Sequence, residues 1–268
     1  MYFKVKDMEY WYEDYGEGTP IVLLHGFTGS SGTWDEIIAS RLKGFRIITV
    51  DLPGHGRTKG KVIKTMDACV ADLHQLFHKL DLKCFFLAGY SMGGRTALNY
   101  AVKYPEKMSG LILESASPGL ADDRERAERR KRDEKLADRI EKEGLEAFVD
   151  YWENIPLFET QKRLPKNVQQ QIRHERLAQT ETGLANSLRG MGTGHQPSRW
   201  ESLKALDLPV LLMVGARDEK FVRINEKMKG QLPRAEMAIF PDCGHAIHIE
   251  KPSEFAEALF AFAKRLVP

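Results

Sequence analysis

Short apolar runs of strand length recur along the chain, and most of them are separated by stretches with helical periodicity. The runs are Ile21–Leu24, Arg46–Val50, Phe85–Ala88, Leu111–Leu113, Val210–Val214 and Met237–Phe240. Each run is nearly continuous rather than alternating, which is typical of strands buried on both faces of a parallel sheet. Met66–Leu80 and Phe255–Leu266 are examples of the helical stretches. This alternation predicts an α/β fold with a mostly parallel, doubly wound sheet.

Two segments depart from this rhythm. Tyr2–Tyr15 alternates aromatic and charged residues, which predicts an antiparallel hairpin at the edge of the sheet. Residues 119–206 contain several helical patterns and no strand-like run. We therefore expect a helical cap of residues 119–206, inserted into a core formed by residues 1–118 and 207–268. Such a cap would shape a pocket and exclude water from it, whereas the alternative is a peripheral bundle without substrate contact.

Length, composition and charge fit one enzyme-sized domain. The chain has 268 residues, of which 42% are hydrophobic and 29% charged, as in ordinary globular proteins. A net charge of +2 gives no electrostatic case for binding nucleic acid or a membrane. The three cysteines are scattered without metal-type spacing, which favours free thiols in a reducing compartment. Because no signal region or membrane-length run is recognised, we expect a cytoplasmic protein, and the oligomeric state stays open.

The strand-like run Phe85–Ala88 leads directly into Gly89-Tyr90-Ser91-Met92-Gly93, and helix-forming residues follow. A strand, a tight turn and a helix around Gly-x-Ser-x-Gly form a nucleophile elbow. The glycines leave room for the strained backbone that Ser91 needs in such a turn. The sequence therefore predicts Ser91 as a nucleophile at a helix N-terminus, where N–H groups favour developing negative charge.

A serine hydroxyl needs a histidine to take its proton and a carboxylate to orient that histidine. His245 comes soon after the run ending at Phe240, and Asp218 follows the run ending at Val214. The order Ser91, Asp218, His245 is the chain order of an α/β-hydrolase triad. His248 and Glu114 are the competing histidine and carboxylate. In the non-catalytic alternative, His245 is a loop histidine and Asp218 caps a helix.

An oxyanion site should accompany this triad. We expect its donors to be the N–H groups of Met92, directly after the nucleophile, and of Phe27, in the loop after Ile21–Leu24. Gly26 would allow a close backbone approach in that loop. His25 is expected to hold the loop by hydrogen bonds rather than to take part in catalysis.

Several of these motifs together resemble the α/β-hydrolase superfamily over almost the whole chain. They are His25-Gly26-Phe27, Asp51-x-x-Gly54-x-Gly56, Gly89-x-Ser91-x-Gly93-Gly94, Asp218 and Gly244-His245. A narrower set resembles the 2-succinyl-6-hydroxy-2,4-cyclohexadiene-1-carboxylate synthase family of menaquinone biosynthesis. That set is Gly89–Arg95, Trp152–Phe158, Gly192–Pro197 and Asp218–Phe221. The resemblance implies an α/β-hydrolase fold with an inserted cap, used by a lyase that eliminates pyruvate after proton abstraction and needs no cofactor or metal.

The arginines support a polycarboxylate as the small-molecule partner, since a guanidinium binds carboxylates with a bidentate fork. Arg95 would lie one helical turn beyond Ser91. Arg126, Arg129 and Arg130 are spaced to share one helix face, and Arg176 and Arg189 fall on later cap helices. For each cap arginine the alternative is a surface ion pair. By resemblance, the cap arginines of the family match Arg129 and Arg176 best, with Arg126 as a substitute for the first.

Aromatic side chains are expected to shape the rest of the pocket, and Lys220 is either a carboxylate contact or a surface lysine. The residues predicted to bind substrate or an oxyanion are Phe27, Tyr90, Met92, Arg95, Arg126, Arg129, Trp152, Arg176 and Lys220. Phe158 is a further aromatic candidate. The rival functional hypothesis is a carboxylesterase or thioesterase with the same triad, and a third is a non-catalytic binding protein on this fold.

Overall fold

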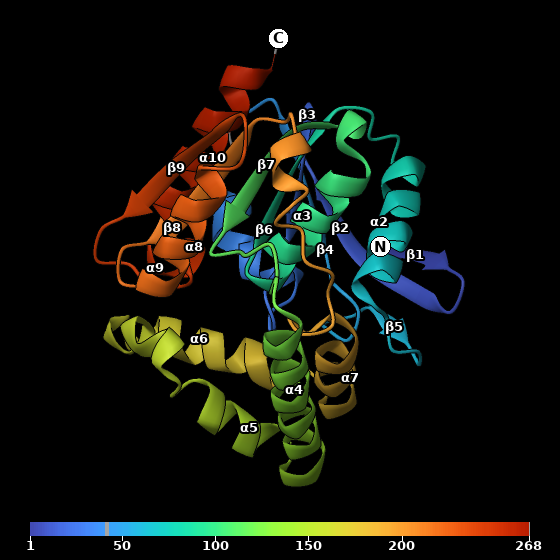
Figure 1. Ribbon diagram of the computed structural model, residues 1–268, viewed down its shortest axis with the longest axis vertical. Helices are drawn as coiled ribbons and strands as arrows, with labels where there is room; N and C mark the ends of the chain where they lie inside the picture. The colour runs from blue at the N-terminus through green and yellow to red at the C-terminus, as the bar shows by residue number, and fades with distance from the viewer. Residues whose placement is uncertain (41–42, 268) are drawn as a thin grey trace.

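One mixed sheet forms the centre of the molecule, and helices cover it on both faces (Figure 1). The computed structural model describes residues 1–40 and 43–267. Within these residues the strands are β1 (Tyr2–Val5), β2 (Met8–Tyr15), β3 (Thr19–Leu24), β4 (Phe45–Val50), β5 (Lys59–Gly60), β6 (Phe85–Tyr90), β7 (Met108–Glu114), β8 (Val210–Gly215) and β9 (Ala235–Phe240). Their order is β1-β2-β4-β3-β6-β7-β8-β9, and β5 pairs with β2.

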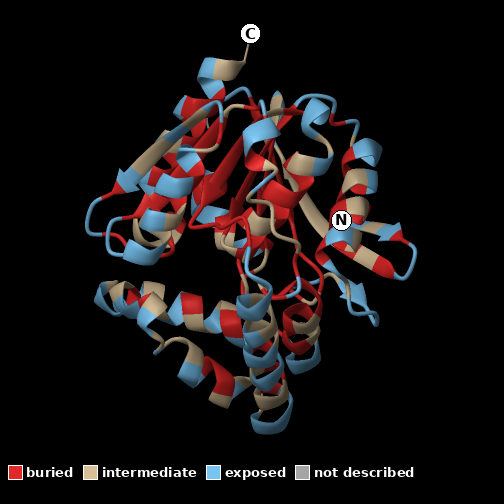
Figure 2. Ribbon diagram, in the orientation of Figure 1, coloured by how far each residue is buried: buried red, intermediate tan, exposed pale blue. Residues whose placement is uncertain are grey.

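All six predicted apolar runs form strands, and these strands pair in parallel. Figure 2 shows the central strands almost entirely buried. The predicted α/β fold with a mostly parallel sheet is therefore confirmed. The expectation of burial on both faces is wrong for β9, in which Ile239 is 49% exposed. β9 pairs only with β8 and ends the sheet, so its outer side faces solvent.

The N-terminal segment forms the predicted antiparallel hairpin, with Val5 opposite Met8. β1 is the edge strand, while β2 also pairs antiparallel with β4. The two-residue β5 was not predicted, because Lys59–Gly60 has no apolar pattern of its own. The hairpin therefore adds an antiparallel margin to a parallel sheet.

The sheet separates two apolar clusters because alternate side chains of a strand point to opposite faces. Val22 and Leu24 of β3 pack in the cluster covered by α2 (Met66–Lys79), α3 (Met92–Lys103) and α8 (Glu219–Lys229). The residues between them, Ile21 and Leu23, belong to the opposite cluster. That second cluster is covered by α1 (Asp35–Ala39), α9 (Ile247–Glu250) and α10 (Pro252–Leu266). Short 3-10 turns are η1 (Ser31–Trp34), η2 (Pro105–Lys107) and η4 (Leu203–Ala205).

The segment between β7 and β8 is helical and lies as a separate layer below the sheet (Figure 1). It contains α4 (Asp123–Glu143), α5 (Leu145–Trp152), η3 (Pro156–Arg163), α6 (Lys166–Leu177) and α7 (Glu181–Met191). These helices bury a small apolar cluster of their own, which includes Ile140, Phe148 and Leu184. Asp122 begins α4 by accepting hydrogen bonds from the N–H groups of Arg124 and Glu125, both at 2.9 Å.

Two further sequence expectations concern the cysteines and membrane-spanning segments. Cys69, Cys84 and Cys243 are all free. None of the helices in the described part of the chain combines the length and the apolar character that a bilayer crossing requires. Residues 41, 42 and 268, which belong to the predicted core segments, lie outside the described residues.

Candidate active site

Ser91 occupies the sharp turn between β6 and α3. Its backbone angles are φ 50° and ψ −105°, a conformation that L-residues rarely adopt. The neighbouring positions must be glycine because a side chain would clash there. A Cβ on Gly89 would lie 2.4 Å from the Gly93 backbone, and a Cβ on Gly93 would lie 2.1 Å from the Leu24 carbonyl oxygen. The Ser91 N–H donates to the Glu114 carbonyl at 2.8 Å. These contacts hold the hydroxyl at the carboxyl edge of the sheet.

Ser91, His245 and Asp218 form one hydrogen-bonded chain. His245 Nε2 lies 3.1 Å from Ser91 Oγ, and His245 Nδ1 lies 2.6 Å from Asp218 Oδ2. His245 is 2% exposed and Asp218 9% exposed. Asp218 Oδ1 also accepts from the Phe221 N–H at 3.4 Å, so the carboxylate caps α8 while it orients the imidazole. The arrangement allows His245 to withdraw the proton of Ser91.

The competing residues His248 and Glu114 pair with each other instead. His248 Nδ1 lies 2.9 Å and 2.8 Å from the two Glu114 carboxylate oxygens, and the His248 N–H donates to Oε1 at 3.1 Å. Both residues are almost fully buried. The Tyr90 ring packs 4.6 Å from the His248 ring and 5.3 Å from the His245 ring, centre to centre. This second pair therefore supports the wall behind the nucleophile.

The loop after β3 is held by His25, as predicted. Its Nε2 accepts from the Leu52 N–H at 2.9 Å, so Nδ1 carries the proton and donates to the Gly26 carbonyl at 2.7 Å. Burial lowers the pKa of His25, which keeps the ring neutral. A Cβ on Gly26 would lie 2.5 Å from the Tyr90 ring. The loop thereby brings Phe27 to the edge of the same cavity as Ser91.

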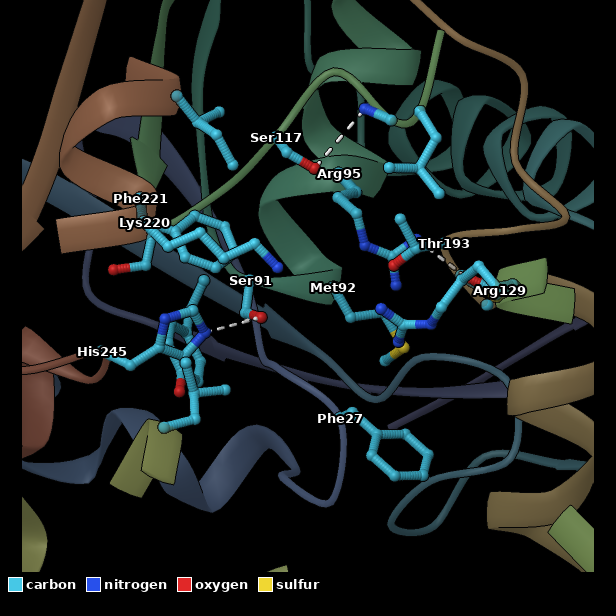
Figure 3. Close-up of a pocket in the computed structure, with 18 of the residues that line it drawn as sticks. Phe27, Ser91, Met92, Arg95, Ser117, Arg129, Thr193, Lys220, Phe221 and His245 are labelled. Carbon is cyan, nitrogen blue, oxygen red and sulfur yellow. Dashed lines mark hydrogen bonds between the residues drawn. The ribbon is translucent and has the colours of Figure 1, made fainter. Parts of the chain in front are cut away.

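A cavity of about 330 Å³ opens at Ser91 and His245, between the sheet and the helical layer (Figure 3). Met92 and Phe27, whose N–H groups are the predicted oxyanion donors, both line it. The remaining predicted aromatic residues that line it are Tyr90, Trp152 and Phe158. Phe27 and Trp152 meet edge to face at 5.5 Å. One end of the cavity is therefore reactive and aromatic.

The other end of the cavity is cationic. Arg95 and Arg129 line it, and Figure 3 shows their guanidinium groups next to each other, while Lys220 lines the cavity from α8 on the side of Ser91. Arg95 Nη1 donates to the Met191 carbonyl at 2.8 Å and to the side-chain oxygen of Gln196. Burial, followed by the repulsion of Arg129, lowers the pKa of Arg95 to about 10, and it stays charged at neutral pH.

The structure does not bring the other predicted arginines into this cavity. Arg126 pairs with Asp123 at 3.2 Å on α4. Arg176 is 5% exposed, donates to Gln161 at 3.0 Å and lies over the Phe158 ring, facing a neighbouring cavity of about 440 Å³. Arg189 pairs with three acidic residues of α4, namely Glu134, Asp138 and Glu141.

Sequence reasoning missed several lining residues, among them Ser117, Thr193, Trp200 and Lys227. Ser117 carries no sequence signal, whereas Thr193 lies in Gly192–Pro197, one of the segments that resemble the synthase family. Lys227 also had a signal, since it lies seven residues after Lys220, which is the spacing of two residues on one face of a helix, here α8. No group of three or more His, Cys, Asp or Glu side chains with the arrangement of a metal site is found among the described residues.

Comparisons with known proteins agree with this geometry. Residues 19–252 match the α/β hydrolase fold family. The chain is 48% identical, over 90% of its length and 89% of the relative, to a Bacillus subtilis (strain 168) protein named "Putative 2-succinyl-6-hydroxy-2,4-cyclohexadiene-1-carboxylate synthase". The structure of MenH from S. aureus superposes with a TM-score of 0.92 at 38% identity, covering 95% of this chain and 98% of that one.

A thermophilic esterase from Thermogutta terrifontis, solved with malate bound, superposes with a TM-score of 0.86 at 29% identity, covering 97% of this chain and 94% of that one. The relatives thus include both a lyase and a hydrolase, and the lyase is the more similar in sequence. The chain belongs to the α/β-hydrolase fold family and, within it, to the family of 2-succinyl-6-hydroxy-2,4-cyclohexadiene-1-carboxylate synthases.

Proposed function

We propose that the protein is a carbon–oxygen lyase that eliminates pyruvate from 2-succinyl-5-enolpyruvyl-6-hydroxy-3-cyclohexene-1-carboxylate, giving 2-succinyl-6-hydroxy-2,4-cyclohexadiene-1-carboxylate. One observation carries the proposal: the hydrogen-bonded chain of Ser91, His245 and Asp218 opens on a cavity whose far wall holds Arg95 and Arg129. Membership of the synthase family supports the same activity. In this proposal the protein works in the cytoplasm, with residues 119–206 as the cap over residues 1–118 and 207–268.

The charge of the cavity suits this substrate, which has carboxylates on its ring, its succinyl arm and its enolpyruvyl group. Arg95 is ion-paired with no carboxylate among the described residues, and its recorded acceptors are neutral oxygens. A buried charge without a counter-charge is costly. A substrate carboxylate would supply that counter-charge, and a neutral ester would not.

The proposed reaction begins when His245, oriented by Asp218, accepts the proton of Ser91. The Ser91 oxygen then takes a proton from the ring carbon. The electrons of the broken C–H bond form a new ring double bond, the existing ring double bond shifts by one position, and the ring bond to the enolpyruvyl oxygen breaks, with its electrons leaving on that oxygen. The proton held by Ser91 and His245 passes to the departing enolpyruvate, which becomes pyruvate. N–H groups of Phe27 and Met92 would stabilise the negative charge that develops on the substrate.

An esterase with the same residues would instead attack a carbonyl carbon and form an acyl-Ser91 intermediate. The two reactions are distinguished by incubating the enzyme with the cyclohexene precursor. We expect pyruvate and diene in equal amounts, with no mass added to the protein at any time. Precursor deuterated at the ring carbon should react more slowly if proton abstraction limits the rate. An adduct on Ser91, or no pyruvate, would favour the hydrolase. The Ser91→Ala variant serves as the inactive control.

A further inference from the structure

The cavity has a second cationic wall that the proposed mechanism does not use. Lys220 and Lys227 of α8 both line the cavity, and so do Phe221 and Ile224 between them. In Figure 3 the Lys220 side chain extends from α8 toward Ser91. Lys220, Ile224 and Lys227 are spaced at i, i+4 and i+7, so they form one stripe along the helix. Two cations thus face the cavity from the side of the core.

The acidic residues of α8 do not neutralise these lysines. Glu219 pairs with Arg223 at 3.0 Å, and the two side chains are largely exposed. The contacts recorded for the lysines are with aromatic rings: Lys220 Nζ lies 5.6 Å from the Phe221 ring centre, and Lys227 Nζ lies 4.6 Å from that of Trp200. Neither lysine has an ion-pair partner in the part of the chain that the structure describes.

The Trp200 contact gives Lys227 a defined position. Trp200 Nε1 donates to the Gly119 carbonyl at 3.0 Å, which holds the indole in place at the cavity wall. An ammonium group on an aromatic face is attracted by the ring and keeps its outward hydrogens free for an acceptor. Along a helix, seven residues span roughly 10 Å, so the two amines can serve different carboxylates or the two ends of one extended anion.

We propose that Lys220 and Lys227 form a second carboxylate-binding subsite, separate from the one at Arg95 and Arg129. The inference rests on the proposed function for the identity of the anion, a small polycarboxylate. With cations on two sides of the cavity, a substrate with several carboxylates is held at more than one point, which raises its affinity without changing the reacting groups at Ser91. A monocarboxylate would use only one wall. The lysine wall thereby selects for polycarboxylates over other acids that fit the cavity.

The test replaces both lysines by methionine, which keeps the apolar stem and removes the charge. The control is Lys229→Met, because Lys229 lies on the same helix and does not line the cavity. Binding of tricarballylate, a simple tricarboxylate, is measured by calorimetry. Loss of a partly exposed ionic contact weakens binding roughly 3- to 5-fold, so K220M/K227M should raise the Kd roughly 10- to 25-fold. The K229M variant should match the wild type.

The proposal is overturned if K220M/K227M and K229M bind tricarballylate equally well, or if the wild type does not bind it. With the cyclohexene precursor, the double variant should raise KM by a similar factor and leave kcat within about twofold. A fall in kcat at constant KM would also overturn it. If the wild type releases no pyruvate from the precursor, the lyase assignment fails, while the tricarballylate comparison still judges the lysine subsite.

Discussion

The backbone of Ser91 stores strain at the reacting residue. A non-glycine residue at φ 50° and ψ −105° costs about 1–3 kcal/mol, which the surrounding contacts offset. We expect Ser91→Gly to relieve this strain and Ser91→Ala to retain it. The Gly variant should be more stable than the Ala variant by about 1 kcal/mol, a difference of roughly 2–4 °C in Tm. Both variants should lose the activity. An equal Tm for the two would show that the turn is unstrained.

Arg95 differs from an ordinary surface arginine because its recorded acceptors are neutral oxygens and it faces the cavity. Arg95→Met should weaken turnover of the polyanionic precursor far more than hydrolysis of a neutral p-nitrophenyl ester. Loss of a charged hydrogen bond of about 1.5–3 kcal/mol corresponds to roughly 10- to 150-fold in kcat/KM. Equal losses on both substrates would mean that Arg95 is structural and would contradict the polyanion argument.

His55 makes the stability of the protein depend on pH. It is 2% exposed, and burial, followed by the neighbouring His25, lowers its pKa to about 3. Since the pKa in the unfolded chain is about 6.5, the unfolded state binds the proton first as the pH falls, and stability declines below that value. Protonation of His55 alone should lower the free energy of unfolding by about 2 kcal/mol between pH 7 and pH 5.

The comparison for this prediction is His55→Asn, because the amide can keep the hydrogen bond that His55 Nδ1 makes to the Pro53 carbonyl at 3.1 Å. Urea unfolding at the two pH values gives the free energy of unfolding for each protein. The variant should lose less stability between pH 7 and pH 5 than the wild type does. The same loss in both proteins would assign the acid sensitivity to other groups.

At the scale of elements, α6 is tied to the loop that carries Phe27. Glu175 of α6 accepts from the Ser30 N–H at 2.9 Å, from the Ser30 hydroxyl at 2.8 Å and from the Thr33 hydroxyl at 2.9 Å. Gln179 accepts from the Gly56 N–H at 2.9 Å. These bonds join the helical layer to the loops after β3 and β4, so the position of the cap and the shape of the oxyanion loop are linked.

We expect Glu175→Ala to increase the mobility of both α6 and the loop that carries Phe27. Charge-assisted hydrogen bonds contribute about 1.5–3 kcal/mol each where they are buried, and these are partly buried. Hydrogen exchange should quicken in α6 and in residues 25–33, and kcat/KM should fall roughly 10-fold. Glu175→Gln keeps an acceptor and should recover most of the loss. The control Glu153→Ala breaks a bond to Arg173 within the cap and should leave the loop unchanged.

At the scale of the whole molecule, three apolar clusters divide the structure: one on each face of the sheet and a smaller one inside the helical layer. Phe148 is fully buried in the cluster inside the helical layer, and Phe85 is fully buried in a cluster on the sheet. Replacing either phenylalanine by Ala should destabilise the cluster that contains it by about 3–5 kcal/mol. We expect Phe85→Ala to lower the free energy of global unfolding and Phe148→Ala to open mainly the cap.

Hydrogen exchange resolved by segment distinguishes the two variants. In Phe148→Ala, protection should fall in α4, α5 and α7 and persist in β6 and β7. If protection falls equally in the sheet, the cap and the core unfold as one cooperative unit, and the division at residues 119 and 206 has no energetic meaning.

The local pattern of the sequence was sufficient for the six parallel strands, the N-terminal hairpin, the elbow and the order of the triad. Continuous apolar runs form parallel strands because both faces must be covered. The carboxyl ends of such strands meet at one edge, so Ser91, Asp218 and His245 could be placed together from their positions after three runs. The role of the glycines around Ser91 could also be predicted from the sequence, because a tight strand–turn–helix needs glycine next to the nucleophile.

The tertiary structure was needed wherever two similar residues compete for one role. His245 and His248 are three residues apart. The order along the chain favours His245 as the triad histidine without excluding His248, and the packing decides, because Asp218 pairs with His245 and Glu114 with His248. Arg129 and Arg130 are adjacent, but successive residues on a helix point about 100° apart, so one lines the cavity and the other bonds the Gly194 carbonyl. How a helix is rotated against its neighbours depends on contacts between distant segments, and no local pattern records that rotation.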